Sequence, residues 1–272
     1  MTASMKLKIA TWNINSVRLR IDLVCRLLQE HAPDILCLQE TKCPQGQFPS
    51  GPLKDLGYTH IAESGQAGYH GVAIISRLPL SQVQVRSFCQ KQDCRHIAAV
   101  ISANPIIVHN LYVPAGGDVP DRTINEKFGH KLDFVAELEH WFGNGSVPDR
   151  HHGIVVGDLN IAPLENDVWS HRQLLKIVSH TPAETSGLTK AQAAGGWVDL
   201  IRQHIPPEEK VYTWWSYRAH DWQLSNRGRR LDHIWTTPDL ARRSQGIEIL
   251  REARGWKQPS DHVPVMATLD LS

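Results

Sequence analysis

The feature that most constrains the fold of this chain is a succession of short apolar runs separated by turn-forming residues. Such runs are typical of buried β-strands. Between them, Leu19, Leu23 and Leu27 recur at every fourth position, which predicts an amphipathic helix over residues 17–31. Because strands dominate and helices are interspersed, we expect two packed β-sheets with helices outside. Strands are predicted at residues 7–13, 34–40, 57–62, 72–76, 83–88, 97–102, 106–113, 153–157, 211–216, 230–236, 246–250 and 263–270.

Two further helices carry start signals in the sequence. Thr123 with Glu126, and Thr181 with Glu184, both have the spacing of a capping box, in which the two side chains satisfy free N–H groups of the first turn. The first box predicts a helix up to about residue 142. A helix is also expected over 197–204.

Composition excludes several classes of protein. Lys and Arg total 29 against 28 Asp and Glu, a net charge of +1, so the chain is not a polybasic binder. No apolar run reaches the ~20 residues of a membrane helix, and the N-terminus lacks a signal-peptide core. The five cysteines include no C-x-x-C pair, and Cys37 lies in an apolar run as a buried thiol. We therefore expect a cytoplasmic protein that does not contact membranes, with a short extension at residues 1–5 and a single domain over 6–272.

Polar side chains stand at the ends of several predicted strands: Asn13, Glu40, Asp158 with Asn160, and Asp261 with His262. Each has an ordinary structural explanation, such as an Asx-turn, a turn cap, a surface acid or a buried structural histidine. Together, carboxylates and amides without thiolates suit a hard cation such as Mg²⁺ or Mn²⁺. The added histidine suggests acid–base work, and the combination favours phosphoryl chemistry.

Six motifs then occur in order: WNIN from residue 12, LQETK from 38, NLYVP from 110, GDLN from 157, RLD from 230 and PSDHVP from 259. This series resembles that of the exonuclease III family of apurinic/apyrimidinic endonucleases, within the endonuclease/exonuclease/phosphatase superfamily. The resemblance covers residues 6–270, and GDLN and SDH alone are shared across the superfamily. It implies an α/β fold in four layers, with two packed mixed β-sheets flanked by helices.

The resemblance also implies roles. It describes a Mg²⁺- or Mn²⁺-dependent DNA-repair nuclease, acting as a monomer on double-stranded DNA at abasic sites and 3′ ends. Glu40 would be the principal metal ligand, in a set that includes Asn13, Asp158, Asn160, Asp261 and His262. Asp158 would orient or deprotonate the attacking water, and Asn160 would steady the water and the phosphate. His262, held by Asp232, would contact the scissile phosphate, and Tyr112 would serve the phosphate or the leaving oxygen.

Residues 211–231 combine aromatic side chains with arginines, a mixture suited to stacking on nucleic acid and binding phosphates. Arg218 belongs to this surface. By resemblance, Trp214, Trp215 and Leu231 would line a pocket for a flipped-out abasic sugar. Trp222 fits the core as well as it fits the DNA surface.

Two positions depart from the family pattern. Ala115 stands where relatives often carry an amide, and Arg229 stands where a bulky apolar pocket residue is common. These departures leave open the balance between abasic-site cleavage and 3′-end trimming.

Two other functions remain possible interpretations of the sequence. One is a phospholipid or inositol phosphatase, which needs an apolar hairpin or a lipid-phosphate pocket, and the sequence shows neither. The other is a catalytically dead nucleic-acid-binding module. The intact polar set argues against the second.

Overall fold

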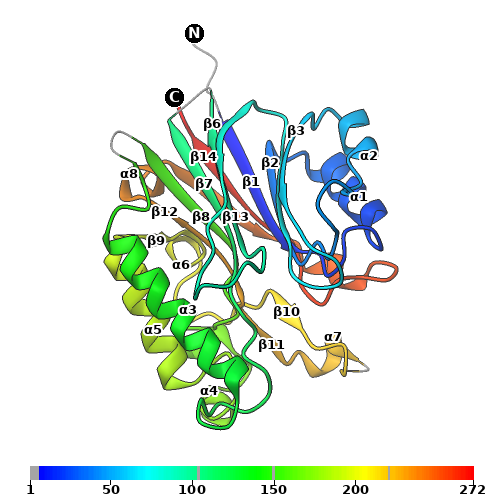
Figure 1. Ribbon diagram of the computed structural model, residues 1–272. Coiled ribbons are helices and arrows are strands. Elements are labelled where there is room, and N and C mark those ends of the chain that lie inside the picture. The colour runs from blue at the N-terminus through cyan, green and yellow to red at the C-terminus, as the bar shows by residue number, and fades with distance from the viewer. Residues whose placement is uncertain (1–5, 103–104, 149–150, 220) are drawn as a thin grey trace.

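The computed structural model describes residues 6–102, 105–148, 151–219 and 221–272. The expected N-terminal extension, residues 1–5, lies outside them. Within the described residues, most strands form two six-stranded mixed sheets (Figure 1). The first has the order β13-β14-β1-β2-β4-β3, and the second has the order β5-β6-β7-β8-β12-β9. The first sheet's strands are β13 (Ser244–Ile249), β14 (Val265–Asp270), β1 (Lys6–Asn13), β2 (Ile35–Gln39), β4 (Val72–Ser76) and β3 (His60–Ser64). The second sheet's strands are β5 (Leu80–Gln84), β6 (His96–Ile101), β7 (Ile106–Tyr112), β8 (His152–Asp158), β12 (Asp232–Thr236) and β9 (Val198–Asp199).

Helices cover the outer face of each sheet (Figure 1). On the first sheet lie α1 (Ile21–His31) and α2 (Gly51–Asp55), and on the second lie α3 (Glu126–Gly143) and α5 (Pro182–Ala194). Shorter elements are η1 (Glu165–Asp167), α4 (His171–Leu174), α6 (Leu200–His204), α7 (Trp222–Ser225), α8 (Pro238–Ala241) and η2 (Arg251–Gly255). A small ribbon pairs β10 (Trp214–Trp215) with β11 (Gly228–Arg229). The expected arrangement of two mixed sheets flanked by helices is confirmed.

Alternation along the strands explains the layers. On β2, Ile35 and Cys37 join the cluster between the two sheets, whereas Leu36 and Leu38 pack toward α1. On β8, Val156 faces the partner sheet and Val155 faces α3 and α5. Successive side chains point to opposite faces of a strand, so each sheet has two apolar faces and must be covered on both. Cys37 is buried between the sheets, as expected.

Several predicted boundaries were wrong. The first helix begins at Ile21 rather than residue 17, because the preceding residues form turns in which Asn15 and Ser16 adopt positive φ, and Leu19 is exposed. Helix α3 is capped by Asn125, whose side chain accepts from the N–H of Lys127. The predicted box at Thr123 is not formed, because its hydroxyl donates to Asp121.

The second capping box, at Thr181 and Glu184, is confirmed. The helix expected over 197–204 splits into β9 and then α6, which begins where the Asp199 side chain accepts from the N–H groups of Ile201 and Arg202. The strand expected over 211–216 is reduced to β10. The strands expected at 57–62 and 83–88 are displaced along the chain, to β3 and β5.

Candidate active site

The site lies where strands from both sheets end. β1 runs parallel to β2, and β7 runs parallel to β8, so the carboxyl ends of each pair reach the same edge. Asn13 ends β1, Glu40 follows β2, and Asp158 ends β8. β12 runs antiparallel to β8 and begins with Asp232, which pairs with Asp158. Loops at the ends of a rigid sheet hold functional side chains in fixed positions, and this topology brings together groups that are distant in the sequence.

The backbone at this edge is unusual. Glu40 and Asn160 both have left-handed φ angles, 49° and 53°, a conformation uncommon for residues with a side chain. Such strained positions concentrate at functional sites. The glycine of GDLN has a packing reason: Gly157 has φ +141°, and a Cβ there would lie 1.9 Å from the carbonyl oxygen of Leu111. The motif therefore requires glycine so that β8 can approach β7.

Glu40 is an ionised carboxylate held by three side chains. Its Oε1 accepts from Asn13 Nδ2 at 2.9 Å and from the Tyr112 hydroxyl at 2.8 Å, and its Oε2 lies 2.9 Å from Lys42 Nζ. Burial alone would raise the pKa of Glu40, but the charge of Lys42 and these hydrogen bonds outweigh it and lower the pKa. The pKa of Tyr112 is raised by burial and by Glu40, so its phenol stays protonated as a donor.

Asp232, His262 and Asp158 form a buried row. His262 Nδ1 lies 2.8 Å from Asp232 Oδ2, and His262 Nε2 lies 3.6 Å from Asp158 Oδ2. Burial would lower the pKa of His262, but the two carboxylates raise it, and the imidazolium is favoured. Burial raises the pKa of Asp158, against the attraction of His262 and with the repulsion of Asp232.

Two asparagines tie the carboxylates together. Asn13 is fully buried, and its Nδ2 donates to both Glu40 Oε1 and Asp158 Oδ2, each at 2.9 Å. Asn160 Nδ2 donates to Asp158 Oδ2 at 3.1 Å and to the Val113 carbonyl at 2.9 Å. The Asx-turn also forms, because Asp158 Oδ1 accepts from the Asn160 N–H at 2.9 Å. The structural and functional readings of Asp158 are therefore compatible.

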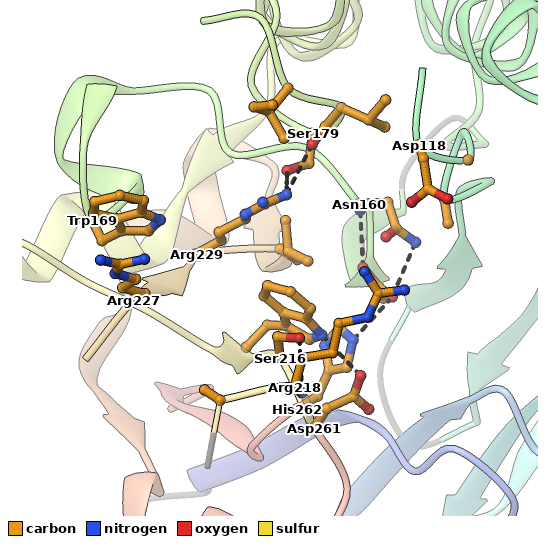
Figure 2. A pocket seen from close by; sticks show the side chains of 18 of the residues that line it. Asp118, Asn160, Trp169, Ser179, Ser216, Arg218, Arg227, Arg229, Asp261 and His262 are labelled. Carbon is orange, nitrogen blue, oxygen red and sulfur yellow. Dashed lines mark hydrogen bonds and ion pairs between the residues drawn. The ribbon is translucent and has the colours of Figure 1, made fainter. Parts of the chain in front are cut away.

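Glu40, Tyr112, Asp158, Asn160 and His262 face a cavity of about 650 Å³, whereas Asn13 and Asp232 lie behind them (Figure 2). The cavity wall includes the acidic end just described and, farther along, arginines beside aromatic rings. Arg227 lies over Trp169, with its Cζ 4.7 Å from the ring centroid, and Arg229 lies over Trp214 at 5.2 Å. Of the sequence-predicted residues, the cavity is lined by Glu40, Tyr112, Asp158, Asn160, Trp214, Arg218, Leu231, Asp261 and His262.

Trp215, which was predicted to line the pocket, lies elsewhere. Trp215 packs into the core against Tyr212 and Trp222, and its Nε1 donates to Asn226 at 3.1 Å, so it does not line the cavity. It neighbours Trp214 on a strand, and neighbouring side chains point to opposite faces. Trp222 is partly buried beside it.

Sequence reasoning also missed two lysines. Lys42, which pairs with Glu40, was readable from LQETK, where it follows the acid by two positions. Lys131 is fully buried, and its Nζ donates to the Asn160 carbonyl at 2.8 Å and lies 2.5 Å from Glu184 Oε1. A single lysine in a predicted helix gives no such signal.

Comparison with known proteins agrees with this geometry. An exodeoxyribonuclease III of Haemophilus influenzae is 28% identical, over 96% of this chain and 99% of its own length. The structure of an AP endonuclease from Archaeoglobus fulgidus superposes with a TM-score of 0.89 at 36% identity, covering 97% of this chain and 100% of that one. A 3′ phosphatase from Neisseria, solved with a product DNA hairpin, superposes with a TM-score of 0.88 at 33% identity. The match covers 97% of this chain and 99% of that one. Residues 10–262 match the model of the endonuclease/exonuclease/phosphatase family, and the chain belongs to that family.

Proposed function

We propose that this protein hydrolyses phosphodiesters of double-stranded DNA 5′ to abasic sites and trims 3′ ends, using Mg²⁺ or Mn²⁺. The DNA-repair nuclease activity follows from the family and from relatives that align over nearly the whole chain. The observation that carries the finer proposal is the buried row of Asp232, His262 and Asp158, which opens into the same cavity as Glu40.

The donor set fits a hard divalent cation. Glu40, Asp158 and Asp261 bring carboxylate oxygens to the cavity, and no cysteine is among the described residues that line it. Asp158, Asp232 and His262 also offer ligand atoms within 4.8 Å of one another. Because Asp232 is fully buried and engaged with His262 Nδ1, we assign that pair to proton handling and centre the cation on Glu40. When bound, the cation would neutralise charge on the phosphate oxygens.

The residues themselves divide the remaining work. Asp158 is placed to accept a proton from an attacking water, and Asn160, which donates to it, fixes its orientation. His262 presents a positively charged ring edge to the cavity and stabilises negative charge on the phosphate. The Tyr112 hydroxyl, which donates to Glu40, holds that carboxylate in place.

The walls of the cavity support a nucleic-acid substrate. Arg218, Arg227 and Trp214 line it, so cations for phosphates stand beside an aromatic ring for stacking. A second cavity of about 520 Å³ shares Tyr112 with the first and is lined by Lys91, Arg95 and Lys127 and by the acids Asp93 and Glu126. Asp93 pairs with Arg95, and we infer that the DNA backbone passes Lys91 and Lys127.

We further propose a monomer built as one domain over residues 6–272, because both sheets share one core and the proposed site is complete without a residue from a partner. All five cysteines are free thiols, which supports a cytoplasmic location. Within the described residues, no helix has the length and apolar character needed to cross a bilayer.

The test is cleavage of a duplex carrying one abasic site, with and without a chelator. We expect a cut 5′ to the site that stops when EDTA removes the metal and resumes when Mg²⁺ is restored. Asp158→Asn should lower kcat by about 10²-fold or more while DNA binding persists, because an amide cannot accept the proton. Asp133→Asn, the same change at an exposed acid of α3, is the control and should cleave normally. An intact duplex after prolonged incubation with wild-type enzyme would overturn the proposal.

A further inference from the structure

Arg229 is a cation in the cavity that the mechanism above does not use. It lies on β11, opposite Trp214 of β10. Its Nη1 donates to the Val178 carbonyl at 2.9 Å and to Ser179 Oγ at 2.7 Å, as Figure 2 shows for the labelled serine. These contacts aim the guanidinium along the cavity wall, and both anchors are neutral.

The Trp214 indole separates this cation from the acidic end of the cavity. One side of the indole meets the Arg229 guanidinium, whose Cζ lies 5.2 Å from the ring centroid. Nε1 of Trp214 donates to Asp261 Oδ2 at 2.9 Å. Arg229 and His262 therefore line different parts of the same cavity (Figure 2).

The charge of Arg229 is unpaired. In the part of the chain that the structure describes, no carboxylate lies within ion-pair distance of it; the charge of Glu184 acts on it from farther away, but Glu184 is paired with Lys131. Nη1 makes both hydrogen bonds, Nε is buried without a partner, and Nη2 donates to no described group. The next residue makes the contrast clear, because Arg230 is held by Asp167 and Asp199 at 2.7 Å. Guanidinium remains charged at neutral pH, and its neutral anchors do not compensate that charge. Nη2 is the donor left for an anion, which we expect the substrate to bring.

We propose that Arg229 binds a second anionic group of the substrate, next to the phosphate that is hydrolysed, and thereby sets specificity. This inference rests on the proposed nuclease function. The Trp214 ring lies against the guanidinium, and Leu231 and Val178 line the same cavity. Apolar groups of this kind weaken the screening of its attraction for an anion. A neutral occupant of the same space would leave the guanidinium desolvated and unpaired, so it would bind less well.

A DNA end carrying 3′-phosphoglycolate provides such a group. Water attacks the phosphorus, the bond from phosphorus to the 3′ oxygen breaks, and the proton lost by the water passes to that oxygen. The products are a 3′-hydroxyl end and free phosphoglycolate, whose carboxylate is the anion assigned to Arg229. The corresponding phosphoglycolamide has nearly the same size and the same reacting bond but no carboxylate charge.

The experiment compares kcat/KM for these two ends on one duplex. Charged hydrogen bonds of this kind predict a preference of about tenfold or more for the carboxylate in the wild-type protein. Arg229→Leu should bring the ratio close to one, and Arg229→Lys should restore part of it. Arg227→Leu removes a charge from the same cavity and should leave the ratio high. Each ratio is measured within a single preparation, so differences in the folded fraction cancel.

The two levels of the hypothesis fail differently. If the wild-type protein removes neither end and leaves abasic DNA intact, the proposed nuclease function is wrong. If it removes both ends equally well, or if Arg229→Leu keeps the wild-type preference, the nuclease function stands and the role of Arg229 is overturned.

Discussion

Asp232 acts on the reaction through another side chain. It is fully buried, does not line the cavity and has His262 Nδ1 at 2.8 Å, so it is a positioning residue for that imidazole. A carboxylate at this nitrogen fixes the tautomer of the ring and favours its charged form. Unlike Asp232, Asp261 lines the cavity, and its carboxylate accepts a hydrogen bond from Trp214 Nε1. The two aspartates near His262 therefore serve different parts of the site.

This pairing predicts non-additive kinetics. Asp232→Asn and His262→Ala should each lower kcat, by about 10²-fold, because either change removes the oriented imidazolium. The double variant should be no worse than His262→Ala alone within a few fold, since groups that act as a unit do not contribute independently. Single-turnover rates on an abasic duplex measure this cycle. If the two defects multiply, the residues act separately.

At the scale of elements, one buried ion pair connects the loop after β8, which contains Asn160, to helices α3 and α5. Lys131 of α3 contacts Glu184 of α5, and also donates to the carbonyl of Asn160. Glu184 in turn accepts from the N–H groups of Ser179 and Thr181. The pair therefore connects the loop after β8 to the loop that contains Ser179, which accepts from Arg229.

Breaking that pair should be costly. Lys131→Met leaves the Glu184 charge buried without its cation, and the expected loss in free energy of unfolding is about 3–5 kcal/mol. Glu184→Gln in the same chain removes the uncompensated charge but keeps acceptor capacity, so the double variant should recover part of the loss. Urea denaturation measures both. A double variant less stable than Lys131→Met would show that the charge is not what the lysine compensates.

The elements also show what a sequence can predict. Strand ends were well marked, because an apolar run followed by Asp158 or Glu40 places a polar group at a sheet edge. Apolar residues at helical spacing over 124–138 predicted one buried helix face. Phe128 and Val135 are buried on α3, whereas Ile124 precedes the helix and is exposed. The spacing could not reveal Lys131 on that same face, because the acid that permits its burial belongs to another helix. The prediction that Trp215 lines the pocket was wrong for a similar reason. Composition located the aromatic cluster, but strand pairing in the fold decides which ring faces the cavity.

At the scale of the whole molecule, the second sheet contains histidines that are buried as neutral rings. His109 of β7 stacks on His96 of β6, with centroids 5.4 Å apart, and its Nε2 lies 3.1 Å from the Ser146 carbonyl. Burial lowers the pKa of His109 to about 4 and lowers that of His96 well below its usual range. His233 of β12 is likewise lowered to about 4, by burial and by Arg230. Folding therefore excludes protons that the unfolded chain would bind.

Burial of His109 as a neutral ring should lower the stability of the protein in mild acid, and His109→Gln isolates this contribution. Because the folded pKa is depressed, the contribution of His109 is complete above the unfolded pKa of about 6.5 and declines toward pH 4. Between pH 7 and pH 5 this amounts to about 2 kcal/mol. The raised pKa values of Asp158 and His262 act in the opposite direction, so the total slope is not diagnostic. The difference in unfolding free energy between wild type and His109→Gln cancels their contributions, and it should shrink by about 2 kcal/mol over this interval. A difference that stays constant from pH 7 to pH 5 would mean that His109 titrates normally in the folded protein.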